Sequence, residues 1–195
     1  TAAYKKFFVS AEASDFVQES HEGEPFLALL ASRGCNHHCR FCAMPDYRIR
    51  YRAHSIDYLE AQFIRWFDEA GVRKFILNDP AINMNREFFK RFLRMMAARG
   101  FRFLAPSGVR ADRVDPETLA LLKGTTAAVI TALETPDPDF ARAHVHKGLD
   151  PAKVVSLAAG AAALNLPTKV HYVVGMPGET IRTVNQTLAT ALALW

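Results

Sequence analysis

Three cysteines, Cys35, Cys39 and Cys42, lie within one short stretch with the spacing C-x3-C-x2-C, and the sequence contains no others. An odd number of cysteines this close together does not make a disulfide framework, whereas several thiolates on one loop are good ligands for a soft metal or a metal cluster. A cubane [4Fe-4S] cluster takes four ligands. Three cysteines would leave one iron open to another molecule, which favours a catalytic site over an electron carrier.

A structural zinc ion is the alternative that this spacing leaves open, with His37, His38 or His54 as the fourth ligand. Zinc sites usually come as paired C-x2-C units on small, loop-rich modules. The cysteines here instead follow an apolar run, residues 25–31, that is typical of a buried strand. The context therefore favours a cluster, and we expect His37 and His38 to be exposed loop residues.

Along the rest of the chain, the sequence predicts strands that alternate with helices. Apolar runs predict strands at residues 25–31, 74–77, 101–105, 127–133 and 169–174. Apolar residues at helical spacing predict helices at residues 56–71, 87–99, 116–124, 150–164 and 180–194. Pro116 and Gly124 are expected to open and close the third helix. The last helix carries its apolar residues at Val184, Leu188, Ala191 and Leu192.

This alternation implies βαβ units and a parallel sheet, so the fold class is α/β. Five strands in 195 residues are too few for an eight-fold barrel, which needs about 250 residues. The pattern predicts a partial barrel that is a fragment of a longer chain. We expect a lead-in at residues 1–24 and one core domain at residues 25–195, with the last strand and the flanking domains outside this chain.

Parallel sheets bind ligands at the carboxyl ends of their strands. The cysteine loop follows the first predicted strand, and polar or glycine-rich residues follow the others. Those expected to contact a cofactor are Asn78, Ser107, Arg110, Glu134, Gly175, Pro177 and Gly178. Asp79 and Tyr172 point towards the same mouth by strand position, and they are the candidate catalytic residues.

Composition restricts the class of protein. The chain has 24 basic and 20 acidic residues, a net charge of +4 that is spread along the sequence. The densest basic stretch, residues 48–52, predicts a solvated edge rather than a nucleic-acid interface. No apolar run is long enough to span a bilayer, and residues 1–20 do not resemble a signal peptide. We therefore expect a cytoplasmic protein with no membrane or nucleic-acid partner.

The cysteine loop, read as C-x3-C-x-aromatic-C with Phe41 as the aromatic residue, resembles the signature of the radical S-adenosylmethionine (SAM) enzymes. The resemblance extends from about residue 25 to residue 195. It implies a partial (β/α)6 barrel of the TIM type with a [4Fe-4S] cluster at its open mouth. It also implies that SAM chelates the iron without a cysteine and is cleaved reductively there.

Later segments are similar to the cobalamin-binding branch of that family. The similarity is carried by residues 50–59 (RYRAHSIDYL), 108–112 (GVRAD), 132–135 (ALET), 147–148 (KG) and 175–180 (GMPGET). This branch implies cobalamin as a third cofactor. Asn78 and Asp79 stand where many radical SAM enzymes carry G-G-E, so the sequence departs from the family there.

The resemblance also implies roles for individual residues. Glu134 would face the ribose hydroxyls of SAM, Gly175 to Gly178 would bring backbone close to the adenine, and Phe41 would pack nearby. Each has an alternative: Glu134 could cap a helix, the glycines could form only a tight turn, and Lys147 is expected at the surface. Arg110 could instead pair with an acidic residue, Asp112 or Asp115.

The resulting hypothesis is a radical SAM enzyme core, from a cobalamin-dependent methyltransferase. It would act on a small-molecule or peptide substrate and receive electrons from an external donor such as flavodoxin or ferredoxin. Two alternatives remain open at the level of sequence. One is a radical SAM methylthiotransferase that acts on tRNA or protein, and the other is a zinc or iron–sulfur module without catalysis.

Overall fold

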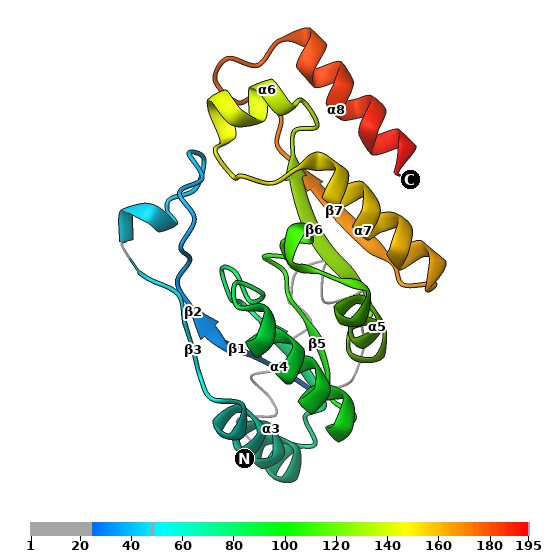
Figure 1. Ribbon diagram of the computed structural model, residues 1–195. Coiled ribbons are helices and arrows are strands. Elements are labelled where there is room, and N and C mark those ends of the chain that lie inside the picture. The colour runs from blue at the N-terminus through cyan, green and yellow to red at the C-terminus, as the bar shows by residue number, and fades with distance from the viewer. Residues whose placement is uncertain (1–24, 48, 195) are drawn as a thin grey trace.

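The computed structural model describes residues 25–47 and 49–194 (Figure 1), so the expected lead-in at residues 1–24 lies outside the described residues. The strands are β1 (Phe26–Leu29), β2 (Ser32–Arg33), β3 (Arg52–Ala53), β4 (Lys74–Leu77), β5 (Arg102–Leu104), β6 (Val129–Glu134) and β7 (Thr168–Tyr172). The helices are α3 (Ile56–Ala70), α4 (Arg86–Arg99), α5 (Pro116–Thr125), α6 (Pro138–Phe140), α7 (Pro151–Ala163) and α8 (Ile181–Ala193). Short 3-10 segments at Met44–Tyr47 and Ala111–Arg113 and a π-helix at Ala141–Val145 complete the elements.

Parallel strands lie side by side in chain order. β1 pairs with β4 and β4 with β5, and β6 pairs with β7. A parallel bridge from Phe103 to Thr126 and a 2.8 Å hydrogen bond from the Val109 amide to the Ile130 carbonyl continue the layer from β5 to β6. The strands curve without closing into a barrel in the described part of the chain, and α3, α4, α5 and α7 follow one another along their outer side (Figure 1). The predicted α/β class is confirmed.

The helices begin where a short polar side chain can accept a backbone N–H. Ser55 accepts from the Tyr58 amide at the start of α3, and Asn85 accepts from the Phe88 amide at the start of α4. Such caps satisfy amides that have no partner inside the helix. Both helices end before a glycine, as the sequence predicts.

Aromatic residues fill the core between the first helices and the strands. Phe63 of α3 stacks on Phe75 of β4 with ring centroids 3.9 Å apart, and Phe92 and Phe101 meet Phe63 edge to face. Edge-to-face contacts are a favourable arrangement for aromatic rings. The amphipathic patterns of α3 and α4 therefore bury the faces that the sequence predicts.

Several expectations about elements differ from the structure. The first strand ends at Leu29, two residues earlier than expected. α5 continues through Gly124 and ends at Thr125, because no steric or conformational feature at Gly124 stops it. α8 buries Thr183 and Thr187 and leaves Leu188 and Leu192 exposed, so its apolar stripe does not face the core. The fifth strand ends at Tyr172, two residues earlier than expected. The β2–β3 pair, α6 and the π-helix are additional elements.

None of the helices in the described ranges has the length and apolar character that crossing a bilayer requires. Arg48, part of the basic stretch, and Trp195 lie outside the described residues.

Candidate active site

The cysteine loop is closed at its base by backbone contacts. β2 and β3 pair antiparallel on either side of the loop, and the Cys35 amide donates to the Ile49 carbonyl at 3.2 Å. Asn36 accepts a 3.0 Å hydrogen bond from the Tyr51 amide. Gly34 has a φ of 75°, and a Cβ atom there would lie 2.4 Å from the carbonyl oxygens of Ile49 and Arg50. Only glycine fits this close approach without moving backbone.

Asp79 supports the same base from the end of β4. Its fully buried carboxylate accepts hydrogen bonds from the Ala31 amide at 3.1 Å, from the Ser32 hydroxyl at 2.6 Å and from the Ser32 amide. Burial raises the pKa of Asp79, and these hydrogen bonds oppose the increase. The structure therefore gives this candidate catalytic carboxylate a structural task, which is to hold the chain where it enters the cysteine loop.

The three cysteines line one cavity of about 220 Å³ at the carboxyl ends of the strands. Segments that follow β1, β4, β5 and β6 all contribute to it, as expected for a parallel sheet. Its walls are Cys35, His37, Cys39, Phe41, Cys42, Met44, Pro80, Ala81, Ser107, Gly108, Val109, Arg110, Ala132, Glu134 and Lys147. The tertiary structure thus brings together the cysteines and four of the expected cofactor contacts, Phe41, Ser107, Arg110 and Glu134.

The three thiols differ in their surroundings within the cavity. All three are free and half-buried, and the Met44 amide points at the Cys42 sulfur from 3.4 Å. Hydrogen bonds to sulfur tune iron–sulfur clusters. Burial raises the pKa of the Cys39 thiol, while the charge of Lys147 opposes that increase. Binding a metal would have to deprotonate this thiol.

In the ranges 25–47 and 49–194, no three His, Cys, Asp or Glu side chains converge as ligands of a single metal ion would. This holds for the three cysteines as well, so the finding does not distinguish a zinc ion from an iron–sulfur cluster. His54 stacks on Tyr58 at 4.9 Å, outside the cavity lining.

Glu134 and Lys147 form a buried ion pair in the wall of the cavity. The Lys147 ammonium donates to both Glu134 carboxylate oxygens, at 2.9 and 3.0 Å, and to the Ala132 carbonyl at 2.6 Å. The Lys147 side chain is 14% exposed and the Glu134 side chain is 5% exposed, so the expected surface position of Lys147 is wrong. Glu134 sits at an irregularity of β6 with a φ of 63°. It does not cap a helix, because Asp137 caps α6.

Arg110 pairs with Asp112, one of its two expected acidic partners, at 3.0 Å. Its guanidinium also donates to the carbonyls of Lys147 and Gly148, at 3.1 and 3.3 Å. Asp115 pairs instead with Lys90. Arg110 therefore fixes the segment that carries Lys147 while also lining the cavity.

The remaining expected site residues do not line the cavity. Asn78 is exposed, and Tyr172 has a buried hydroxyl with no hydrogen-bond partner and a pKa raised by burial. The turn at Gly175, Pro177 and Gly178 lies outside the lining as well. Glu179 holds this turn by accepting hydrogen bonds from the amides of residues 175 and 176.

His37 is a cavity residue that sequence reasoning missed, because it was expected to be exposed. Its Nε2 atom is buried without a hydrogen-bond partner in the structure, and burial together with Arg110 lowers its pKa. Its neighbour His38 is exposed, as expected. Two adjacent histidines in a loop carry no periodic signal that would tell which one turns inward.

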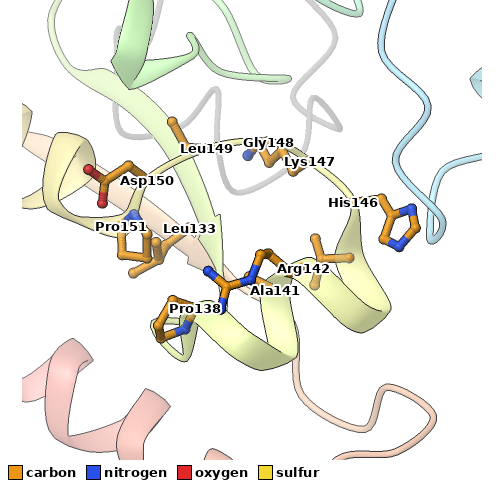
Figure 2. A pocket seen from close by; sticks show the side chains of 11 residues that line it. Leu133, Pro138, Ala141, Arg142, His146, Lys147, Gly148, Leu149, Asp150 and Pro151 are labelled. Carbon is orange, nitrogen blue, oxygen red and sulfur yellow. The ribbon is translucent and has the colours of Figure 1, made fainter.

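A second cavity, of about 560 Å³, lies at the end of β6 between α6, the π-helix and the start of α7 (Figure 2). Leu133 lines it, whereas Ala132 and Glu134 line the cysteine cavity. Successive strand residues face opposite sides of a sheet, so the two cavities lie on opposite faces of β6. Lys147 borders both. Figure 2 shows Arg142 beneath the segment that carries Lys147 and Gly148.

Residues 29–191 match the radical SAM superfamily, so this protein belongs to that superfamily. It is 26% identical over 175 residues to the cytidylyl-2-hydroxyethylphosphonate methyltransferase of Streptomyces wedmorensis, which covers 89% of this chain and 32% of that protein. It is 22% identical over 175 residues to an uncharacterized methyltransferase of Pyrococcus horikoshii, covering 89% of this chain and 38% of the relative. The chain thus spans about a third of the length of these relatives.

Two solved structures share the fold. The radical SAM methyltransferase TsrM of Kitasatospora setae, solved with cobalamin and a [4Fe-4S] cluster, gives a TM-score of 0.77 at 20% identity over 87% of this chain and 35% of that chain. The cobalamin-dependent SAM radical enzyme OxsB, solved with aqua-cobalamin and SAM, gives 0.66 at 14% identity over 85% of this chain and 26% of that one. At these identities the likeness establishes the fold, which is that of radical SAM enzymes.

Proposed function

We propose that this chain is the core of a radical SAM methyltransferase, in which Cys35, Cys39 and Cys42 hold a [4Fe-4S] cluster. The observation that carries the proposal is the cavity itself. Three thiols, with no fourth cysteine, line the same cavity as a carboxylate–ammonium pair that is largely buried. Three thiolates leave one cluster corner for a small molecule, and the pair supplies polar contacts beside it.

The residues of the cavity have distinct tasks in this proposal. The cysteines would bind the cluster, which on reduction supplies an electron for cleaving a carbon–sulfur bond of SAM or supporting methyl transfer. Glu134 keeps free lone pairs beside its two contacts with Lys147, so its carboxylate can accept from the ribose hydroxyls of SAM. Phe41 and Val109 offer apolar surface that limits water around the site.

Cobalamin dependence is the finer part of the proposal. It is supported by the fold shared with TsrM and OxsB, both solved with a cobalamin bound. Cobalamin would carry the methyl group to a small-molecule or peptide substrate. An external donor such as flavodoxin or ferredoxin would reduce the cluster, and we propose a cytoplasmic location for this chemistry.

Anaerobic reconstitution with iron and sulfide, followed by reduction and addition of methyl-labelled SAM, tests the proposal. We expect about four irons and four sulfides per chain, and SAM should change the electron paramagnetic resonance (EPR) spectrum of the reduced cluster. Cys39→Ala should lose both properties. A chain that takes up one zinc ion and assembles no cluster would overturn the proposal. Formation of 5′-deoxyadenosine with the label retained in methionine indicates radical formation, whereas transfer of the label to added cobalamin indicates methyl transfer.

A further inference from the structure

Arg40, which lies between two of the cysteines, joins the cysteine loop to the π-helix. Its guanidinium Nη1 donates to the Ala143 carbonyl at 2.8 Å, a contact that spans 103 positions of sequence. Its backbone amide donates to the Val145 carbonyl at 3.0 Å. Carbonyls in the last turn of a helix have no partner within the helix, and Arg40 satisfies two of them. Figure 1 shows the two segments at the same end of the molecule.

Contacts with residues outside the cysteine loop also hold the π-helix in place. His144 stacks on Phe140 with ring centroids 4.5 Å apart. The ring also lies against Gly178, where an added Cβ atom would stand 2.5 Å from the imidazole Cε1. Val145 is buried with Phe140 and Met176 in a small apolar cluster. These contacts leave the π-helix little freedom, so a loop attached to it is held in one place.

The same segment leads directly to the ion pair. Two residues after Val145 comes Lys147, whose ammonium holds the Glu134 carboxylate. The Arg110 guanidinium also donates a hydrogen bond to the backbone carbonyl of Lys147. The Arg40 contacts therefore connect the loop that carries the cysteines to the segment that carries the polar wall. If the Arg40 contacts were lost, the distance between the cysteine loop and the segment that carries Lys147 could vary.

We propose that Arg40 is a positioning residue that fixes the open corner of the cluster relative to the Glu134–Lys147 pair and so sets the affinity for SAM. This inference rests on the proposed function. Arg40 does not line the cavity, so it acts through the loop rather than by touching the ligand. Cluster assembly does not depend on it, because the contacts at the base of the loop are separate from it.

The test compares Arg40→Ala and Arg40→Lys with the original chain, all loaded with cluster. Arg142→Ala is the matched control, because Arg142 lies on the same π-helix and pairs with Asp139 instead of the loop. We expect unchanged iron content in every variant. The Arg40–Ala143 contact is exposed to solvent, and the hydrogen bond from the Arg40 amide remains in Arg40→Ala, so the lost interaction is a weak one. Arg40→Ala should therefore weaken SAM binding by about two- to fivefold, with a smaller SAM-induced change in the EPR spectrum.

Arg40→Lys should recover part of the affinity, because its ammonium can still reach a carbonyl, and Arg142→Ala should bind SAM as the original chain does. Unchanged SAM affinity in Arg40→Ala would overturn the inference. Loss of the cluster to the level of Cys39→Ala would also overturn it, because Arg40 would then be needed only to form the loop. If the original chain loads the cluster but does not bind SAM, the proposed function fails first.

Discussion

The two ends of the cysteine loop are held in different ways. At the base, a glycine, a buried aspartate and a short antiparallel pair fasten residues 31–36 to residues 49–53 and to the end of β4. At the tip, the side chain and the amide of Arg40 donate hydrogen bonds to carbonyls of the π-helix. Among the residues that the structure describes, the base has several interactions that reinforce one another, whereas the hydrogen bonds that join the tip to the π-helix come from the side chain and the amide of Arg40.

This difference separates two functions of the loop. A redundant base determines whether the three thiols come together at all. A sparsely held tip determines where they sit relative to Glu134 and Lys147, and this position is open to change by mutation. The predictions below test whether assembly and positioning are separable in this way.

The largest effect is expected at the base, from Gly34→Ala. A methyl group there would meet two backbone carbonyls at 2.4 Å, and no flexible side chain is available to move aside. We expect iron content after anaerobic reconstitution to fall to that of Cys39→Ala. Gly124→Ala is the control, because a Cβ atom there meets nothing within 4 Å and the residue is helical. It should keep the cluster and gain about 0.5–1 kcal/mol of stability. Normal iron content in Gly34→Ala would contradict the assignment of the base.

A smaller effect is expected in the polar wall, from Lys147→Met. It would leave Glu134 buried without its cation, and breaking a buried pair in this way costs about 3 kcal/mol. Urea unfolding should show this loss, and the double change Lys147→Met with Glu134→Leu should recover much of it. Lys123→Met, at an exposed position on α5, should change stability by less than about 0.5 kcal/mol. Equal stability of Lys147→Met and the original chain would mean that the pair contributes nothing to the fold.

The smallest effect is expected far from the loop, from Asp115→Ala. Asp115 caps α5 by accepting from the Thr118 amide at 2.8 Å, and it pairs with Lys90. Loss of the cap should cost about 1 kcal/mol of stability and leave cluster loading unchanged. A reduced iron content would show that assembly responds to general stability and not only to the base of the loop.

The pH dependence of the free energy of unfolding gives a second test of the role of Asp115. Hydrogen bonds from Lys90 and Thr118 lower the pKa of Asp115 below its usual 3.8. Its contribution to stability is therefore present above pH 3.8 and is lost as the pH falls below that value. The loss should be small, because the carboxylate is 43% exposed and solvent screens the pair. Asp115→Asn should remove this part of the acid dependence.

Much of the scaffold follows from patterns that are local in the chain. Apolar spacing predicted α3 and α4, and the apolar run at residues 74–77 predicted β4 with its observed bounds. α8 shows where such patterns fail. Periodicity finds the helix, but which face is buried depends on what packs against it, and here two threonines face inward while two leucines are exposed.

The residues of the site likewise include some that the sequence predicts and some that it does not. The three cysteines and Glu134 could be named from spacing and strand position, because the C-x3-C-x2-C spacing puts three thiols on one short loop and strand ends meet at one edge of a parallel sheet. The inward positions of Lys147 and His37, and the presence of the π-helix, could not be predicted from the sequence. Their roles depend on contacts across long separations in the chain, such as the 103 positions between Arg40 and Ala143. Local spacing thus specifies which groups can do the chemistry, whereas burial and long-range packing determine which of them face one another.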